Sequence, residues 1–157
     1  LVAEGIRISK LHFSSALSVK PGAEVLDGLA DFAEDIYFHQ VVARGEGGEL
    51  TRYRDLPDAL AAAARGETVD GTEWRIHFHV PLHCPPCRLF DTTSNQLKAA
   101  IDVLGAGPAM CSHIEMETYT WEVLPSEMKQ RDVADQLVGE YEWTLAQLAG
   151  HGILPVG

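Results

Sequence analysis

Hydrophobic and polar residues alternate along two short segments, Trp74–Pro81 and His113–Trp121. Such alternation is typical of a β-strand, in which successive side chains point to opposite faces of a sheet. The apolar residues of both segments predict faces that pack under helices. The opposite faces carry two histidines and two glutamates: His77, His79, Glu115 and Glu117. Packing alone does not explain two imidazoles and two carboxylates aimed the same way, so they indicate a site.

The rest of the chain alternates between predicted strands and predicted helices. Two further strands are expected over residues 10–17 and 36–42. The spacing of apolar residues predicts amphipathic helices over 21–34, 56–64, 93–104 and 133–150. Their ends carry the usual signals, since Asp55 is a suitable N-cap, Thr93 and Gln96 are spaced as a capping box, and Gly105 is a stop.

Four successive β-α units predict an α/β fold with a parallel sheet and right-handed crossovers. The spacing suits either a doubly wound sheet or a (β/α)8 barrel. No glycine-rich phosphate loop follows any strand, and polar groups lie near the C-terminal strand ends, where barrel active sites are built. Because a full barrel takes about 250 residues, we expect residues 1–157 to form a single partial domain, the C-terminal half of a (β/α)8 TIM barrel, with the N-terminal half absent from this chain.

Composition narrows the classes of function. Hydrophobic residues make up 46% of the 157, which excludes a disordered chain. The 12 Lys and Arg against 23 Asp and Glu give a formal charge of −11, which repels nucleic-acid backbones and anionic lipid surfaces. No apolar stretch reaches the roughly 20 residues that span a bilayer, so membrane insertion is not expected. Three cysteines, an odd number, argue against a disulfide framework and for a cytoplasmic location.

The polar residues of the four predicted strands form one candidate constellation. Mixed imidazole and carboxylate groups suit a divalent metal such as Zn or Mn. His79 and Glu117, nearest the C-terminal ends of their strands, are the expected metal ligands. Catalytic acid-base roles are assigned to Glu117, Glu115 and His77. The other strands and the end of the last one add candidate rim or pocket residues: His12, Ser14, His39, Gln40, Tyr119 and Trp121.

Two alternatives stay open at this point. The polar residues of the strands could be buried groups that satisfy one another, because a buried carboxylate costs several kcal/mol unless it is paired. Cys84-Pro-Pro-Cys87 could be a second metal or redox site, with His83 beside it. A redox pair of this spacing is expected to open a helix, whereas this one is predicted in a loop with proline at both inner positions.

The motifs around these residues resemble xylose-isomerase-like TIM barrels, and more closely the EboE-type metabolite-traffic branch of that superfamily. The resemblance is carried by four segments: Leu11–Leu17, His77–Leu82, Thr92-Thr93 and Glu115–Pro125. It implies divalent-metal chemistry on sugars or polyols, with His79 (or His77) and Glu117 at the metal. One departure is that the usual Asp of the sixth strand has no clear counterpart in Tyr37–Gln40.

The sequence therefore predicts a metal-dependent isomerase or epimerase that acts on a small sugar or cyclitol-like metabolite. Glu117 or Glu115 would move a proton beside the metal-bound oxygens. The alternative is a non-catalytic metabolite-traffic protein, a binding or export-coupled carrier on the same scaffold. Half a barrel leaves two sheet edges unpaired, so self-association or pairing with the missing barrel half is also expected.

Overall fold

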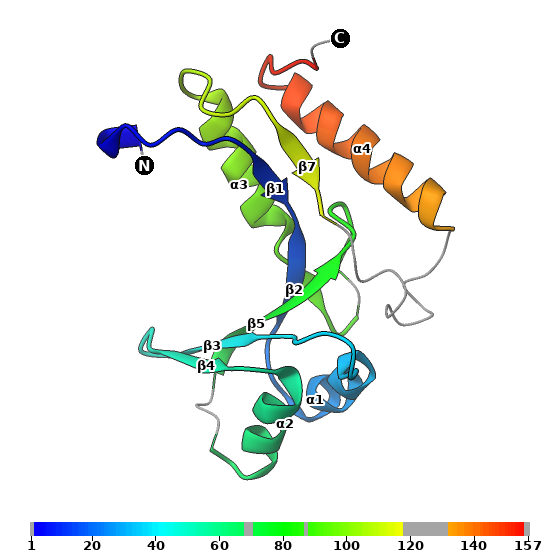
Figure 1. Cartoon of the computed structure of the whole chain (residues 1–157). Helices are drawn as coiled ribbons and strands as arrows, with labels where there is room; N and C mark the ends of the chain where they lie inside the picture. The colour runs from blue at the N-terminus through cyan, green and yellow to red at the C-terminus, as the bar shows by residue number, and fades with distance from the viewer. Residues whose placement is uncertain (1, 68–70, 87, 118–131, 156–157) are drawn as a thin grey trace.

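The largest element of the fold is a five-stranded sheet with the order β4-β3-β5-β2-β6 (Figure 1). The computed structural model describes residues 2–67, 71–86, 88–117 and 132–155. The strands are β2 (Ser15–Val19), β3 (Val41–Gly45), β4 (Leu50–Tyr53), β5 (Gly71–Val80) and β6 (Asp91–Thr92). Every neighbouring pair in this sheet is antiparallel.

A second, two-stranded sheet pairs β1 (Leu11–Phe13) with β7 (Ile114–Met116) in parallel. Its register places His12 opposite Glu115. Only Ser14 separates β1 from β2, so one extended segment of the chain contributes a strand to each sheet. This segment joins the two parts of the fold.

The helices lie in two groups (Figure 1). On one side of the five-stranded sheet lie α1 (Ala23–Leu29), the short 3-10 helix η2 (Ala30–Phe32) and α2 (Leu56–Ala64), while α3 (Ser94–Gly105) and α4 (Val133–Ala149) flank the parallel pair. A short 3-10 turn, η1 (Val2–Glu4), precedes β1. One core fills the space under the large sheet, around Leu17, Trp74 and Phe78. A smaller core lies between the parallel pair and its helices, around Phe13 and Ile101.

The predicted fold, four successive β-α units forming the C-terminal half of a (β/α)8 barrel, is wrong. Between the second predicted strand and its helix lies β4, which returns beside β3 as an antiparallel hairpin. The hairpin loop Gly45–Glu49 turns tightly because Gly48 adopts a φ of +87°, a conformation that favours glycine. The chain therefore reverses direction within the sheet, and β5 pairs antiparallel with both of its neighbours.

The predicted strand over 36–42 also starts later than expected, at Val41. The Glu34 carboxylate accepts hydrogen bonds from the backbone N–H groups of Ile36, at 2.5 Å, and Tyr37, at 3.0 Å. These bonds hold the chain in a bend that cannot join a sheet. The helix predicted over 56–64 is α2 with the same limits, and the Asp55 carboxylate accepts from the N–H of Leu56 at its start.

In the described ranges, no helix combines the length and the apolar character that crossing a membrane demands. Two of the three cysteines, Cys84 and Cys111, lie in these ranges, and Cys111 is a free thiol.

Candidate functional site

The centre of the candidate site is a pair of histidines on β5. His77 and His79 are two residues apart on one strand, so their side chains leave the same face. Their rings stack with centroids 4.9 Å apart and planes 27° apart. Their Nε2 atoms approach to 2.8 Å. Both nitrogens are therefore directed at one common point.

The other ring nitrogen of each histidine meets an oxygen. His79 Nδ1 lies 3.0 Å from the backbone carbonyl oxygen of Glu117, and His77 Nδ1 lies 2.9 Å from Oε1 of Gln40. A carbonyl oxygen can only accept, so His79 Nδ1 carries the proton and its Nε2 presents a lone pair in the neutral ring. If the Gln40 oxygen accepts from His77 Nδ1, the two Nε2 lone pairs lie 2.8 Å apart and need a positive centre between them.

That centre is a proton or a metal cation. If the Gln40 amide turns to donate instead, the proton lies on His77 Nε2 and is given to His79. In each arrangement the lone pair of His79 Nε2 is directed at the space between the two rings, where it binds either the proton of His77 Nε2 or a metal ion. Histidine ligands of metals are held in this way, with one nitrogen on an oxygen acceptor and the other on the metal.

The two histidines differ in exposure. His79 is 1% exposed, whereas His77 lies at the surface. Burial lowers the pKa of His79, the nearby His77 and His39 lower it further, and the Glu117 carbonyl and charge only partly oppose this. The result is a pKa below the ordinary value, which keeps His79 neutral at pH 7. A neutral imidazole is the form that ligates a metal.

A second cluster surrounds His12 on β1. Its Nε2 lies 3.6 Å from a carboxylate oxygen of Glu115, and its Nδ1 lies 3.7 Å from one of Glu117, within ion-pair range when the imidazole is protonated. Lys10 approaches Glu115 to 3.0 Å. The hydrogen bond and charge of Lys10 lower the pKa of Glu115, which is more than half exposed. Both carboxylates are thus partly open to solvent.

Glu117 connects the two clusters. Its backbone carbonyl binds His79, while its carboxylate is turned to His12. The predicted metal ligands His79 and Glu117 are thus neighbours, but through a main-chain oxygen. Across the described part of the chain, no three His, Cys, Asp or Glu side chains form a group that could hold a metal ion. The side chain that the structure brings to His79 is that of His77, to which the sequence assigned an acid-base role, and not that of Glu117.

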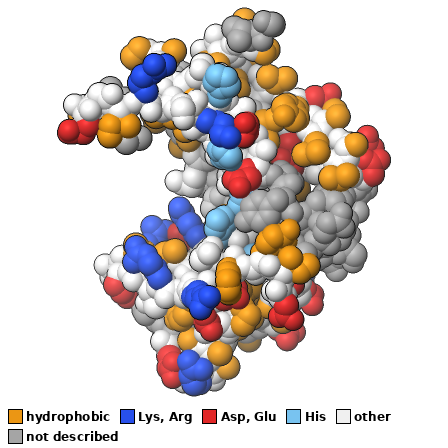
Figure 2. Space-filling model, viewed as in Figure 1, with side chains coloured by type: hydrophobic (Ala, Val, Ile, Leu, Met, Phe, Trp, Pro, Cys, Tyr) orange, Lys and Arg blue, Asp and Glu red, His pale blue; other side chains and the backbone are white. Residues whose placement is uncertain are grey.

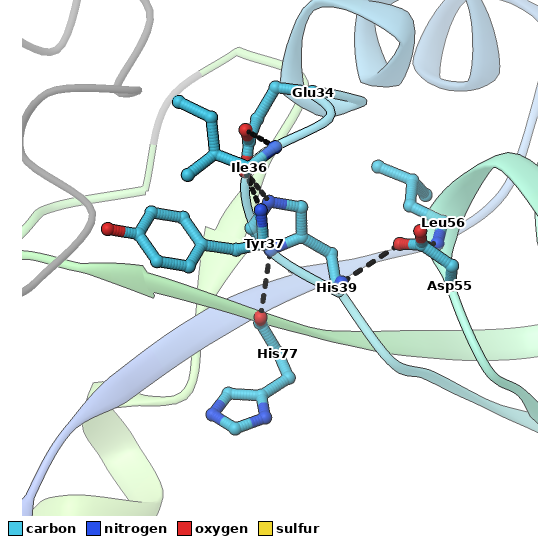
Figure 3. A network of polar contacts seen from close by, with 7 residues as sticks. All are labelled: Glu34, Ile36, Tyr37, His39, Asp55, Leu56 and His77. Carbon is cyan, nitrogen blue, oxygen red and sulfur yellow. Dashed lines mark hydrogen bonds and ion pairs between the residues drawn. The ribbon is translucent and has the colours of Figure 1, made fainter.

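His39, predicted as a pocket residue, lies in the core at 1% exposure. Figure 3 shows its contacts. Its Nε2 lies 2.8 Å from Oε1 of Glu34 and its Nδ1 lies 3.2 Å from the backbone oxygen of His77. Its backbone N–H donates to Asp55. Both ring nitrogens thus face oxygen atoms, and His39 and Glu34 form a buried ion pair when the imidazole is protonated.

The remaining predicted pocket residues divide into two groups. Ser14 and His12 line a largely apolar cavity of about 580 Å³ between β1 and α3, together with Leu97 and Met110. Tyr119 and Trp121 lie outside the described residues, as does Cys87. The Cys84 thiol contacts the carbonyl of Pro85.

Sequence reasoning missed Glu34 and Lys10. Glu34 comes at the end of a predicted amphipathic helix, where a carboxylate reads as a solvated surface group. The available signal was indirect, because a histidine within an apolar strand pattern needs a buried partner. Lys10 stands next to the predicted strand that carries His12 and could have been assigned to the carboxylates of the neighbouring strand.

Comparisons with known proteins add no relative to this geometry. No protein-family model, no curated protein and no solved structure matches the chain. The function must therefore be argued from the side chains themselves.

Proposed function

We propose that this chain binds a divalent metal ion, such as Zn or Mn, through Nε2 of His77 and His79, and uses it as an isomerase or epimerase on a small sugar or cyclitol-like molecule. The observation that supports this is the convergence of two Nε2 atoms at 2.8 Å while both Nδ1 atoms face oxygens. A buried, neutral His79 beside an accessible His77 gives one anchored and one adjustable ligand.

The donor set fits such an ion. Zinc–imidazole bonds are about 2.0–2.1 Å long, so two nitrogens on one ion lie at most about 4.2 Å apart. The two histidines meet this limit. They also supply fewer protein ligands than a closed structural site, which leaves room for ligand oxygens. A bound ion of this kind polarises a hydroxyl or carbonyl oxygen.

Glu117 is the proposed proton acceptor, and Glu115 is the second candidate. The Glu117 carboxylate is 40% exposed and 3.7 Å from His12, so it is accessible to a small molecule. Glu115 is held more closely, by Lys10 at 3.0 Å. Removal of a proton from the carbon beside a polarised oxygen is the step that isomerases and epimerases share, and a positioned carboxylate can perform it.

From the resemblance to xylose-isomerase-like proteins we keep only this chemistry as a proposal. The barrel fold of that superfamily is not the fold of this chain. Metal-dependent chemistry on a polyol remains consistent with the histidine pair, since this chemistry depends on the ligating nitrogen atoms rather than on the sheet that carries them.

A non-catalytic carrier is the second candidate function. Two observations favour it: both carboxylates point to His12 rather than to the histidine pair, and the neighbouring cavity is largely apolar. As part of the proposal we place the protein in the cytoplasm, in line with its odd number of cysteines. We also propose self-association through the outer edges of the β1–β7 pair, which light scattering after size-exclusion chromatography would reveal as a mass above 17.2 kDa.

The test is a metal titration of chelator-treated protein by calorimetry, with Zn²⁺ and Mn²⁺. His77→Ala and His79→Ala should each weaken binding by about 100-fold, whereas the control His113→Ala, an exposed histidine near β7, should not. The site would be excluded if the parent binds neither ion. It would also be excluded if all three variants bind both ions as tightly as the parent does.

Catalysis is then tested separately. Metal-loaded protein is incubated in D₂O with a panel of sugars and cyclitols, and NMR follows deuterium entering carbon positions. Exchange that Glu117→Gln abolishes supports the enzyme. Tight ligand binding with no exchange in the parent protein supports the carrier.

A further inference from the structure

The uncovered face of the five-stranded sheet carries an arginine row. One register line crosses all five strands in the order Arg52, Val42, Arg75, Ser18 and Asp91. The side chains of this line are exposed or half-buried, whereas their strand neighbours Val41, Ala43, Trp74 and Ile76 are buried on the helix side. The helices α1 and α2 cover the other face, so this one faces solvent (Figure 1).

Positive charge exceeds negative charge at the centre of this face. Arg44 and Arg75 both bind the single carboxylate of Glu73, the latter at 2.9 Å. Burial raises the pKa of Glu73, but hydrogen bonds from Arg75 and Ser18 and the two guanidinium charges outweigh it, so Glu73 stays ionised. In the ranges that the structure describes, Arg52 has no acidic partner. Three guanidinium groups thus share this face with two carboxylates, Glu73 and Asp91.

The same face is hollowed. A polar cavity of about 640 Å³ extends from Arg44 and Arg75 to Lys20, with Glu73 and Asp91 in its lining. Figure 2 shows this side of the molecule concave, with Lys and Arg side chains gathered over β3, β4 and β5 and His side chains deeper in the hollow. For a chain with a net charge of −11 this is an unusual local excess of positive charge.

The arginine row lies next to the histidine pair. Arg75 and His77 are two residues apart on the same face of β5, a spacing of about 7 Å along a strand. Arg52 and Arg75 flank Val42 on adjacent strands, so their Cα atoms lie about 10 Å apart. Two long side chains at this spacing can reach one small anion between them, and guanidinium groups bind phosphate or carboxylate oxygens in pairs.

We infer that Arg52 and Arg75, with Arg44 behind them, form a subsite for an anionic group, a phosphate or a carboxylate, of the small molecule whose oxygens lie at His77 and His79. The assignment of that molecule rests on the proposed function, but the anion site does not depend on the metal. A nucleic acid fits poorly, because the positive face is confined to a few residues of an acidic protein.

The test is a titration of the full chain with inorganic phosphate, followed by ³¹P NMR, and a parallel titration with malonate as the carboxylate probe, followed by calorimetry, both in low salt and in the presence of a chelator. Arg52→Gln should weaken phosphate binding about 10-fold, and Arg52→Gln with Arg75→Gln further. The matched control is Arg65→Gln, which removes an exposed arginine at the end of α2 that binds Glu67. The double variant loses the Arg75–Glu73 contact and could unfold the sheet. In that case the single variant Arg52→Gln still tests the proposal.

The outcomes are distinct. Loss of binding in the Arg52 variant with retention in the control supports the subsite. Absence of phosphate and malonate binding by the parent, equal binding in all variants, or equal loss in the control would overturn it. Tighter binding of phosphate or of malonate identifies the anionic group. Metal affinity measured on the arginine variants, and phosphate affinity on His77→Ala, separate failure of this subsite from failure of the metal site.

Discussion

Two kinds of histidine meet at β5, and their hydrogen bonds distinguish them. His39 has an acceptor at each ring nitrogen, Glu34 and the backbone oxygen of His77, so its bonding is complete. His77 and His79 each have one nitrogen on an oxygen and direct the other at its neighbour. Burial does not separate the two kinds, since His39 and His79 are both 1% exposed.

The comparison shows that an ion site is recognised by where the second nitrogen points. A histidine whose two ring nitrogens both face oxygens within the fold has no nitrogen directed at an ion. A histidine with one acceptor and a converging partner keeps a lone pair available. We therefore expect substitutions at His39 to change stability, and substitutions around His77 and His79 to change affinity.

The largest expected effect is on the stability of His39→Ala. It removes a buried imidazole and leaves the Glu34 carboxylate without its hydrogen-bond partner, which should lower the free energy of unfolding by about 3 kcal/mol. Urea denaturation followed by circular dichroism measures this. A variant as stable as the parent would show that the Glu34–His39 pair has no structural role.

The next effect concerns Gln40, which holds Nδ1 of His77 at 2.9 Å. Gln40→Ala should weaken Zn²⁺ binding about 10-fold, because groups that orient a ligand histidine typically affect affinity by 10–100-fold. Calorimetry measures it, with Gln96→Ala, an exposed residue of α3, as the control. Unchanged affinity in Gln40→Ala would mean that His77 does not bind the ion in the observed orientation.

A smaller effect follows from pH. Burial raises the pKa of Glu34, but hydrogen bonds from Ile36, His39 and Tyr37 and the His39 charge together lower it below its usual 4.5. A lowered folded-state pKa contributes stability that is present above pH 4.5 and is lost as pH falls through the folded value. The free energy of unfolding of the parent should thus exceed that of Glu34→Gln by about 1 kcal/mol near pH 6, and this difference should narrow toward pH 3. A gap that widens on acidification would contradict this sign.

The smallest effect is expected for His77→Ala in the absence of metal. His77 is exposed, and its removal also relieves the close approach of the two Nε2 atoms. The free energy of unfolding should therefore change by no more than about 0.5 kcal/mol. The same denaturation measurement checks it, and a loss comparable with that of His39→Ala would erase the distinction between the two kinds of histidine.

Local structure was largely predictable from the sequence, but strand direction was not. The helix over 56–64 and the alternation in β5 follow from periodicity and capping, which act between near neighbours. The direction of β5 depends on the hairpin of β3 and β4. Alternating residues on both sides of Gly45–Glu49 are a hairpin signal, and interpreting this loop as a strand-to-helix connection made the sheet parallel.

The candidate site was predictable only in part. Alternation placed His77 and His79 on one face, and the structure brings their nitrogens together. Alternation also placed Glu115 and Glu117 on one face, but their partners, Lys10 and His12, depend on which strand pairs with β7. Such long-range pairing, like the burial of His39, is a property of the whole fold and has no counterpart in local spacing.

The extended segment that forms β1 and β2 has a consequence for the order in which the protein is made. Its first half pairs with β7 and its second half with β5, both synthesised much later. At about 5–20 residues per second, the ribosome needs on the order of 5–20 s to make the roughly 100 residues between β1 and β7. During that time the apolar side of the segment has no final partner. The nascent chain must therefore be kept from aggregating, by dilution or by a chaperone, until the last strand emerges.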